Sequence, residues 1–189
     1  MLVQFAHLGA AYAELAYGIE SPKVGLLTIG SEAEKGNKLV KRALELLQAS
    51  PGIHFAGNVE GHDLLTGKVD VITTDGFTGN VALKTMEGAV RYAFDELKET
   101  ISDSRLAKLG AVMQRSRIRE LRRRLDAEAH GGAVLLGLNG TVVIAHGSSK
   151  AQGISAACQL AADLSSDGIV AETGDRVATT PPPPAVVTP

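Results

Sequence analysis

Three polar, glycine-rich segments each follow a short apolar run, and each precedes a pattern typical of a helix. They cover residues 30–37, 75–80 and 146–150. Glycine allows backbone N–H groups to approach an anion closely, and the N-terminus of a helix favours negative charge. Lys35 adds a positive charge to the first segment. The pattern fits a phosphate site, and it equally fits ordinary strand-to-helix connections in which Asn37 or Asp75 caps a helix. The candidate phosphate- or substrate-binding residues are Gly36, Asn37, Asp75, Gly76, Thr78, Gly79, Gly147, Ser148 and Ser149.

The sequence lacks the motifs of nucleotide-binding and metal-binding sites. There is no Walker sequence and no GxGxxG at a strand-to-helix turn, so a nucleotide fingerprint is absent. The histidines show no i, i+4 pair and no HExxH motif, and we expect neither a metal ion nor a cofactor. His7 lies in an apolar helical pattern and is expected to be structural. Cys158, which lies among small residues, is expected to be a buried hydrophobic residue rather than a nucleophile.

Composition places the chain among soluble globular proteins. Of its 189 residues, 44% are apolar and 21% are charged, which is typical of about one folded domain. A net charge of −2, with three tyrosines, four phenylalanines and no tryptophan, argues against a nucleic-acid partner. No apolar run approaches the roughly 18 residues of a membrane span, and the first residues lack the basic region of a signal peptide. We therefore expect a cytoplasmic protein.

Strands that alternate with helices are expected to position the three segments. Such alternation favours a mainly parallel sheet with helices on both faces, hence an α/β protein with three α/β/α layers. Asn139-Gly140 favours an antiparallel hairpin between the last two strands. Residues 1–166 are predicted to form one domain, and residues 167–189 a disordered, proline-rich tail. Apolar spacing predicts helices near 5–15, 37–47, 83–101 and 151–164, and strands at 23–29, 53–56, 69–73, 133–136 and 141–145.

A strongly basic stretch interrupts the body of the chain. Eight basic residues and a single acidic residue, Glu120, lie in the range from Arg105 to Arg124. Apolar residues at steps of three and four predict two short amphipathic helices, a helical hairpin over residues 104–126. This hairpin fits a solvated element that packs in a dimer, and it also fits a surface that lies on an anionic membrane. The candidate membrane contacts are Leu106, Leu109, Met113, Arg122, Arg123 and Arg124.

Four segments, in this order, resemble the PlsX family, the phosphate acyltransferases of bacterial phospholipid synthesis. They are VGLLTIGSEAEKGNKLV, GNVEG, VDVITTDGFTGNVALKTMEG and GGAVLLGLNGTVVIAHGSSKA, and the resemblance covers about residues 2–164. It implies an α/β/α fold like that of isocitrate and isopropylmalate dehydrogenases, in a homodimer. It also implies transfer of a fatty acyl group from acyl carrier protein to inorganic phosphate. The resulting acyl phosphate is consumed by a membrane glycerol-3-phosphate acyltransferase, and the family associates peripherally with the membrane, which the basic hairpin suits.

The resemblance assigns catalytic roles to Lys35 of the KGN segment and Asn80 of the DGFTGN segment. Phosphate, held by Lys35 and the loop N–H groups, would attack the thioester carbonyl while Asn80 stabilises the oxyanion. Either Lys35 or His146 would protonate the leaving thiolate. The family's N-terminal half, with its Asp-Ala-Met-Gly-Gly-Asp motif, has no counterpart here, so the fold is expected to be incomplete at the N-terminal side. Two alternatives are a non-catalytic membrane-binding or dimerisation module, and a coenzyme A-dependent enzyme like phosphotransacetylase.

Overall fold

The computed structural model describes residues 1–102, 104–125, 131–147 and 149–179. Contacts between residues divide the chain into two compact units. The first, called the sheet unit, comprises the described residues of Met1–Asp75, Val134–Val143 and Leu160–Pro189. The second comprises those of Gly76–Ala133 and Ile144–Gln159, and it is called the α3 unit after its long helix, α3 (Gly76–Ser102).

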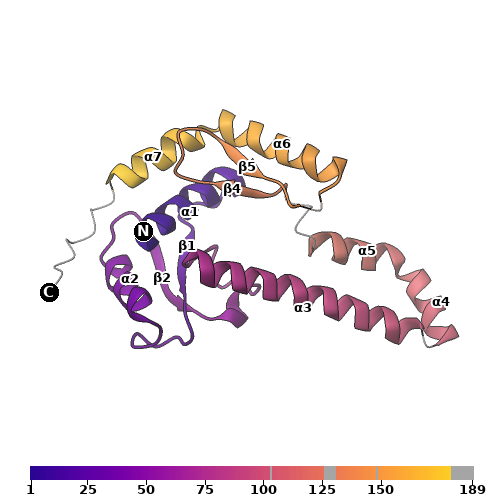
Figure 1. Ribbon diagram of the computed structural model, residues 1–189. Helices are drawn as coiled ribbons and strands as arrows, with labels where there is room; N and C mark the ends of the chain where they lie inside the picture. Colours follow the sequence, from indigo (N-terminus) through magenta and orange to yellow (C-terminus); the bar gives the residue numbers. More distant parts are fainter. Residues whose placement is uncertain (103, 126–130, 148, 180–189) are drawn as a thin grey trace. The chain divides into compact units, whose positions relative to one another are not determined.

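A three-stranded parallel sheet forms the centre of the sheet unit (Figure 1). Its strands are β1 (Lys23–Leu27), β2 (His54–Val59) and β3 (Val71–Thr73), in the order β2-β1-β3. A short 3-10 turn, η1 (Gly61–Asp63), lies in the connection from β2 to β3. The prediction of an α/β protein with a parallel sheet is confirmed.

The second strand runs past its predicted end at residue 56. Its register against β1 shifts between Val24 and Gly25, which marks a bulge, and Gly57 takes a left-handed φ of 95°. Glycine adopts this conformation without the steric cost that a Cβ would add. The bulge therefore carries β2 on to Asn58 and Val59, where the sequence suggests a turn.

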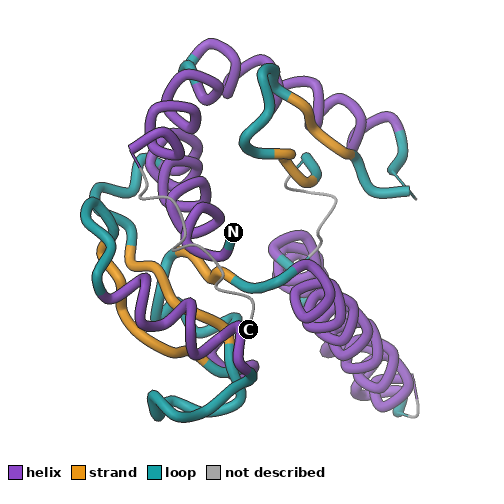
Figure 2. The backbone as a smooth tube through the Cα atoms, turned by 60° about the vertical axis from the view of Figure 1, so that its left-hand side comes forward, coloured by secondary structure: helices purple, strands orange, loops and turns teal. Residues whose placement is uncertain are grey.

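Two helices pack on this sheet and close its core (Figure 2). They are α1 (Leu2–Tyr17) and α2 (Lys38–Gln48). Val24 and Leu26 of β1 lie in the core cluster and have no exposed surface. Their alternate positions along the strand place both side chains on the face that the helices cover. The buried residues of α2, at helical spacing, are Val40, Ala43, Leu44 and Leu47.

The region predicted as a disordered tail contains a helix. After α6 (Ala151–Ser166), the chain forms α7 (Ile169–Thr179), and α7 packs against α1. The prediction of disorder is therefore wrong for residues 169–179. The proline-rich residues 180–189 lie outside the described part of the chain.

Side-chain spacing explains why α7 forms. Ile169 and Thr173 are four residues apart and are both buried. Arg176 forms an ion pair with Glu172, one turn earlier, at 2.7 Å, and a second ion pair with Glu14 of α1. An i, i+4 pair stabilises a helix, and one buried face anchors it. Composition alone does not reveal either feature.

Three helices follow one another in the α3 unit. After α3 come α4 (Arg105–Met113) and α5 (Arg115–Arg124), the two short helices predicted for the basic stretch. Ser104 caps α4, because its Oγ accepts a hydrogen bond from the backbone N–H of Ala107 at 3.3 Å. The predicted end of the hairpin, residue 126, lies outside the described residues.

Two further sequence predictions concern the second half of the chain. β4 (Ala133–Leu135) and β5 (Val142–Ile144) pair with each other in a two-stranded sheet, so the pairing predicted across Asn139-Gly140 is confirmed. Cys158 on α6 is exposed, and the expectation that it is buried is wrong. Among its close neighbours on α6, the buried residue is Ala157.

Truncation of the central core residue tests this packing. We expect Leu26→Ala, at a residue with 0% exposure, to lower the free energy of unfolding by about 2–5 kcal/mol, because it leaves a cavity under both helices. Leu65→Ala, at a residue 65% exposed in the same unit, should change it by less than about 0.5 kcal/mol. Urea denaturation followed by circular dichroism measures both. Equal losses in the two variants would contradict the described core.

Candidate functional site

The first glycine-rich segment leaves the sheet at the carboxyl end of β1. The backbone N–H of Thr28 donates to the carbonyl of Val59 at 2.9 Å, which extends the β1–β2 pairing by one residue. The chain then turns through residues 29–36 and enters α2. Open parallel sheets bind ligands at this end of their strands. The local geometry is therefore that of a ligand-binding edge.

The N-terminus of α2 is capped from within the segment. The Asn37 side chain accepts a hydrogen bond from the backbone N–H of Val40 at 2.9 Å. The capping role considered for Asn37 from its sequence is thus confirmed. The N–H groups of Lys38 and Leu39, in the first turn, have no acceptor within the helix, as at any helix start. They are the donors that an anion would use.

Lys35 lies in the turn that precedes this helix, and its side chain is exposed. Its backbone N–H donates to the carbonyl of Glu32 at 3.1 Å. A Cβ added at Gly30 would lie 2.7 Å from Lys35 Cγ, so the glycine makes room for the lysine stem. Within the part of the chain that the structure describes, no carboxylate forms an ion pair with Lys35. Its charge is available to an external anion.

Gly36 is a position that accepts only glycine without strain. Its φ is 95°, in the left-handed region. A Cβ there would lie 2.7 Å from Thr28 Oγ1 and 2.8 Å from Val40 Cγ1. The backbone of the segment therefore packs directly on the end of β1 and the start of α2. This contact fixes the path by which the chain enters the helix.

The second glycine-rich segment is mostly helix. α3 begins at Gly76, so Thr78, Gly79 and Asn80 occupy its first turns, and the expectation of a loop through residue 80 is wrong. Asp75 immediately precedes the first helical residue, the position where a short polar side chain favours a helix start. Asp75 belongs to the sheet unit, and Gly76 onward to the α3 unit.

The third segment lies in the α3 unit. The backbone N–H of Ser149 donates to the carbonyl of His146 at 2.9 Å, which forms a turn before α6. Ser149 Oγ lies 3.0 Å from where a Cβ on Gly153 would be, so this side chain packs on the first turn of α6. Gly147 is exposed within the turn. Ser148 lies outside the described residues.

The charge of His146 acts on Glu87 of α3. The pKa of Glu87 lies below its ordinary value, chiefly because Lys84 Nζ donates to its carboxylate at 2.8 Å, and the charges of Lys84, His146 and Arg91 lower it further. Asn80, Lys84 and Glu87 follow one another at steps of four and three on one face of α3. The sequence pointed to Asn80 and His146 and not to the Lys84–Glu87 ion pair, which helical spacing from Asn80 could have indicated.

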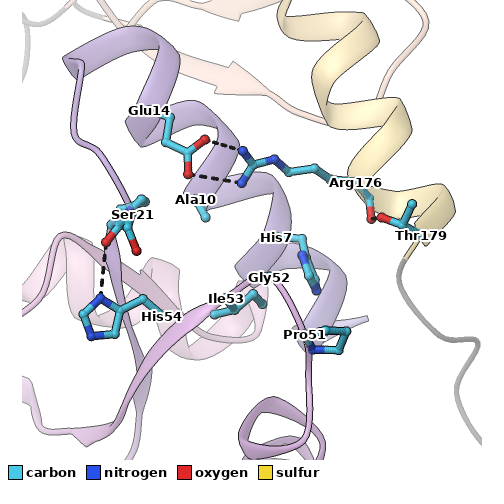
Figure 3. A pocket seen from close by; sticks show the side chains of 11 residues that line it. His7, Ala10, Glu14, Ser21, Pro51, Gly52, Ile53, His54, Arg176 and Thr179 are labelled. Carbon is cyan, nitrogen blue, oxygen red and sulfur yellow. Dashed lines mark hydrogen bonds and ion pairs between the residues drawn. The ribbon is translucent and has the colours of Figure 1, made fainter.

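A cavity of about 600 Å³ lies elsewhere in the sheet unit, and none of the predicted site residues lines it (Figure 3). Its wall includes His7, Glu14, His54 and Arg176, with Glu14 and Arg176 paired across it. His7 is 5% exposed, its Nε2 lies 3.0 Å from Ser50 Oγ, and its pKa is lowered by burial and then by the charge of Arg176. The structural role expected for His7 agrees with this environment.

The helices α4 and α5 expose apolar and basic side chains, the two kinds of residue predicted to contact a membrane. Leu106 and Met113 of α4 are 79% and 78% exposed, and Leu109 is also exposed. On α5, both Nε and Nη2 of Arg123 donate to the carboxylate of Glu120, and Arg124 is exposed. The side chain of Arg122 lies outside the described part of the chain.

Over the described residues, no helix is both long enough and apolar enough to cross a bilayer. In the same ranges, no three histidine, cysteine or acidic side chains gather as a metal site would require.

Comparison with known proteins identifies relatives over most of the chain. The family model described as "Fatty acid synthesis protein" matches residues 1–172. A phosphate acyltransferase of Thermobifida fusca is 64% identical over 167 residues, which are 87% of this chain and 46% of the relative. Phosphate acyltransferases of Gloeobacter violaceus and a Geobacillus species are 48% and 46% identical, over 85% and 89% of this chain and 47% and 51% of their own lengths. The chain spans about half the length of the curated relatives it matches.

Substitution of Gly36 tests the geometry of the first segment. We expect Gly36→Ala to lower the free energy of unfolding by about 1–3 kcal/mol, because the new Cβ meets Thr28 and Val40 and the backbone is left-handed. Gly61→Ala is the matched control, since a Cβ there meets nothing within 4 Å; its effect should stay within about 0.5 kcal/mol. Thermal or urea denaturation measures the difference. A Gly36→Ala variant as stable as the control would contradict the described turn.

Proposed function

The chain belongs to the fatty acid synthesis protein family, and on this basis we propose that it carries out phosphate acyl transfer, the activity for which its relatives are named. The proposed reaction transfers a fatty acyl group from acyl carrier protein to inorganic phosphate. The product, an acyl phosphate, then enters phospholipid synthesis. One observation supports this most directly: at the end of β1, an exposed Lys35 that forms no ion pair among the described residues precedes the start of a capped helix.

Inorganic phosphate is proposed to bind at this segment. The N–H groups at the start of α2 are directed donors, and the Lys35 ammonium group adds a full positive charge. Gly36 lets the segment pack directly on Thr28 and Val40 as the chain enters the helix. A dianion or monoanion with several acceptor oxygens matches both kinds of donor.

The chemical step needs no covalent enzyme intermediate, because phosphate itself is the nucleophile. A phosphate oxygen attacks the thioester carbonyl carbon, the C–S bond breaks, and the thiolate leaves and takes a proton. Asn80 is proposed to donate to the developing oxyanion, and Lys35 or His146 to supply the proton. His146 is an alternative to Lys35 because it lies in the third glycine-rich segment, and the role of Asn80 rests on the family motif alone. The dehydrogenase-like three-layer fold, the homodimer and the downstream membrane acyltransferase are proposals on the same basis.

Acyl phosphate formation tests the proposal. The purified 189-residue chain should form acyl phosphate from palmitoyl-acyl carrier protein and phosphate. Lys35→Ala should raise the KM for phosphate, because it removes the charge that holds the anion. Asn80→Ala should lower turnover about 10²–10³-fold. Lys41→Ala removes the same charge from an exposed site on α2 and should leave the rate unchanged.

The Thermobifida fusca relative is the positive control for this assay. A folded chain that forms no acyl phosphate while the relative does would contradict the proposed activity. A chain active only with coenzyme A thioesters would identify the phosphotransacetylase-like alternative instead.

A second proposal concerns the exposed apolar face of α4. We propose that α4 and α5 lie on an anionic membrane surface, with Leu106, Leu109 and Met113 inserted among the acyl chains and Arg124 near the lipid phosphates. The observation that favours this is the exposure of large apolar side chains beside a basic helix. A solvated helix rarely exposes several such residues together, whereas an interfacial helix requires them.

Vesicle sedimentation tests this contact. Binding to vesicles with anionic lipid should exceed binding to neutral vesicles and should weaken with salt. Arg124→Ala should reduce binding about fivefold, since each basic side chain contributes about 1 kcal/mol near such a surface. Arg42→Ala on α2 is the charge-matched control and should have no effect. Equal binding to neutral and anionic vesicles would count against the proposal.

A further inference from the structure

A buried amide lies under the segment that carries Lys35. Asn58, placed in β2 just after the bulge and opposite Leu26 of β1, is only 9% exposed. Its Nδ2 donates a hydrogen bond to the backbone oxygen of Glu32 at 3.0 Å. This bond joins two residues that are 26 positions apart in the sequence. A side chain of β2 therefore holds the middle of the turn between β1 and α2.

The same Glu32 oxygen accepts a second hydrogen bond. The backbone N–H of Lys35 donates to it at 3.1 Å. Two hydrogen bonds that share one carbonyl thus connect the Asn58 amide to the Lys35 backbone. The Lys35 stem then runs along Gly30, where a Cβ would lie 2.7 Å from Lys35 Cγ. The backbone and the stem of this lysine are both held, and its ammonium end is left exposed.

Folding stability alone does not explain an amide at this position. Asn58 Oδ1 and the nearby Thr28 Oγ1 are both buried, and neither has a hydrogen-bond partner among the described residues. A buried polar atom without a partner costs folding free energy. An apolar side chain of similar size at residue 58 would avoid that cost. The advantage of asparagine here lies in its bond to Glu32.

We propose that Asn58 is a positioning residue for phosphate binding. It fixes the Glu32 carbonyl, and through this carbonyl the Lys35 backbone, so that the ammonium group is directed to an anion at the start of α2. The inference rests on the proposed function, because it takes inorganic phosphate as the ligand of this segment. Asn58 acts through Lys35 and does not contact the phosphate, since it is buried.

The first experiment measures the position of Lys35 without any ligand. In Asn58→Leu, hydrogen exchange at the Lys35 backbone amide, followed by NMR on the full chain, should become about tenfold faster, the effect of losing one neutral hydrogen bond. The stability of the fold should not fall, because the variant also removes the unpartnered Oδ1. Thr28→Val is the matched control under the same segment: it removes a hydroxyl that bonds to nothing described, and exchange at Lys35 should not change. Unchanged exchange in Asn58→Leu would overturn the proposal.

The second experiment tests coupling to phosphate. Titration calorimetry with inorganic phosphate should show about tenfold weaker binding in Asn58→Leu than in the natural sequence. In a Lys35→Met background the same change should have no further effect, because Asn58 acts only through Lys35. Additive effects of the two substitutions would overturn a positioning role. Should Asn58→Leu fail to fold, Asn58→Ala removes the same donor without adding volume.

The two experiments separate this proposal from the one it rests on. If the natural chain binds no phosphate, the proposed phosphate site is wrong, and faster exchange at Lys35 in Asn58→Leu still supports the positioning link. If the natural chain binds phosphate through Lys35 but Asn58→Leu changes neither exchange nor affinity, the phosphate site stands and the role of Asn58 is wrong.

Discussion

The pairing of β1 on both edges is the constraint on which the sheet unit depends. β1 is held between β2 and β3, and Val24 and Leu26 are closed off by α1 and α2. A strand fixed in this way leaves the sheet at one defined place and in one direction. The segment after β1 therefore starts from a rigid end, and the single left-handed glycine at residue 36 is enough to bring it to α2. Functional groups on such a segment are held in place by the rigid sheet.

The candidate phosphate site consists mainly of backbone N–H groups, and a few side chains cap the helix, supply charge and hold the backbone in position. Asn37 satisfies one N–H at the start of α2 and leaves the earlier ones free. Lys35 supplies the charge, and Asn58 connects its backbone to the neighbouring strand through Glu32. Asn58 Oδ1 and Thr28 Oγ1 are buried beneath the segment and have no hydrogen-bond partner among the described residues, so this layer is not optimised for stability alone. Rigid support and an exposed cation are what anion binding requires.

The sequence predicted much of this arrangement, and its errors have physical causes. Apolar spacing located α2, α3 and α6, and short apolar runs located β1 and β3 within a few residues, because both patterns reflect burial directly. Glycine-rich spacing could not distinguish a loop from the first turns of α3, since Gly76 to Asn80 suit either. The amino-acid composition of residues 169–179 did not indicate α7, because Arg176 of this helix pairs with Glu14 of α1, which is distant in the sequence. The contribution of Asn58 could not be predicted from local spacing, because its partner is 26 residues away.

The proposed activity depends most on the binding of phosphate by the segment between β1 and α2. The most direct measurement is a titration of the isotopically labelled chain with inorganic phosphate, followed residue by residue in amide NMR spectra. Phosphate binding at this segment should give saturable shifts concentrated on the amides of residues 35–39, and little change at the cavity lined by His7 and Arg176. Shifts that are absent from residues 35–39, or that centre on that cavity, would contradict it.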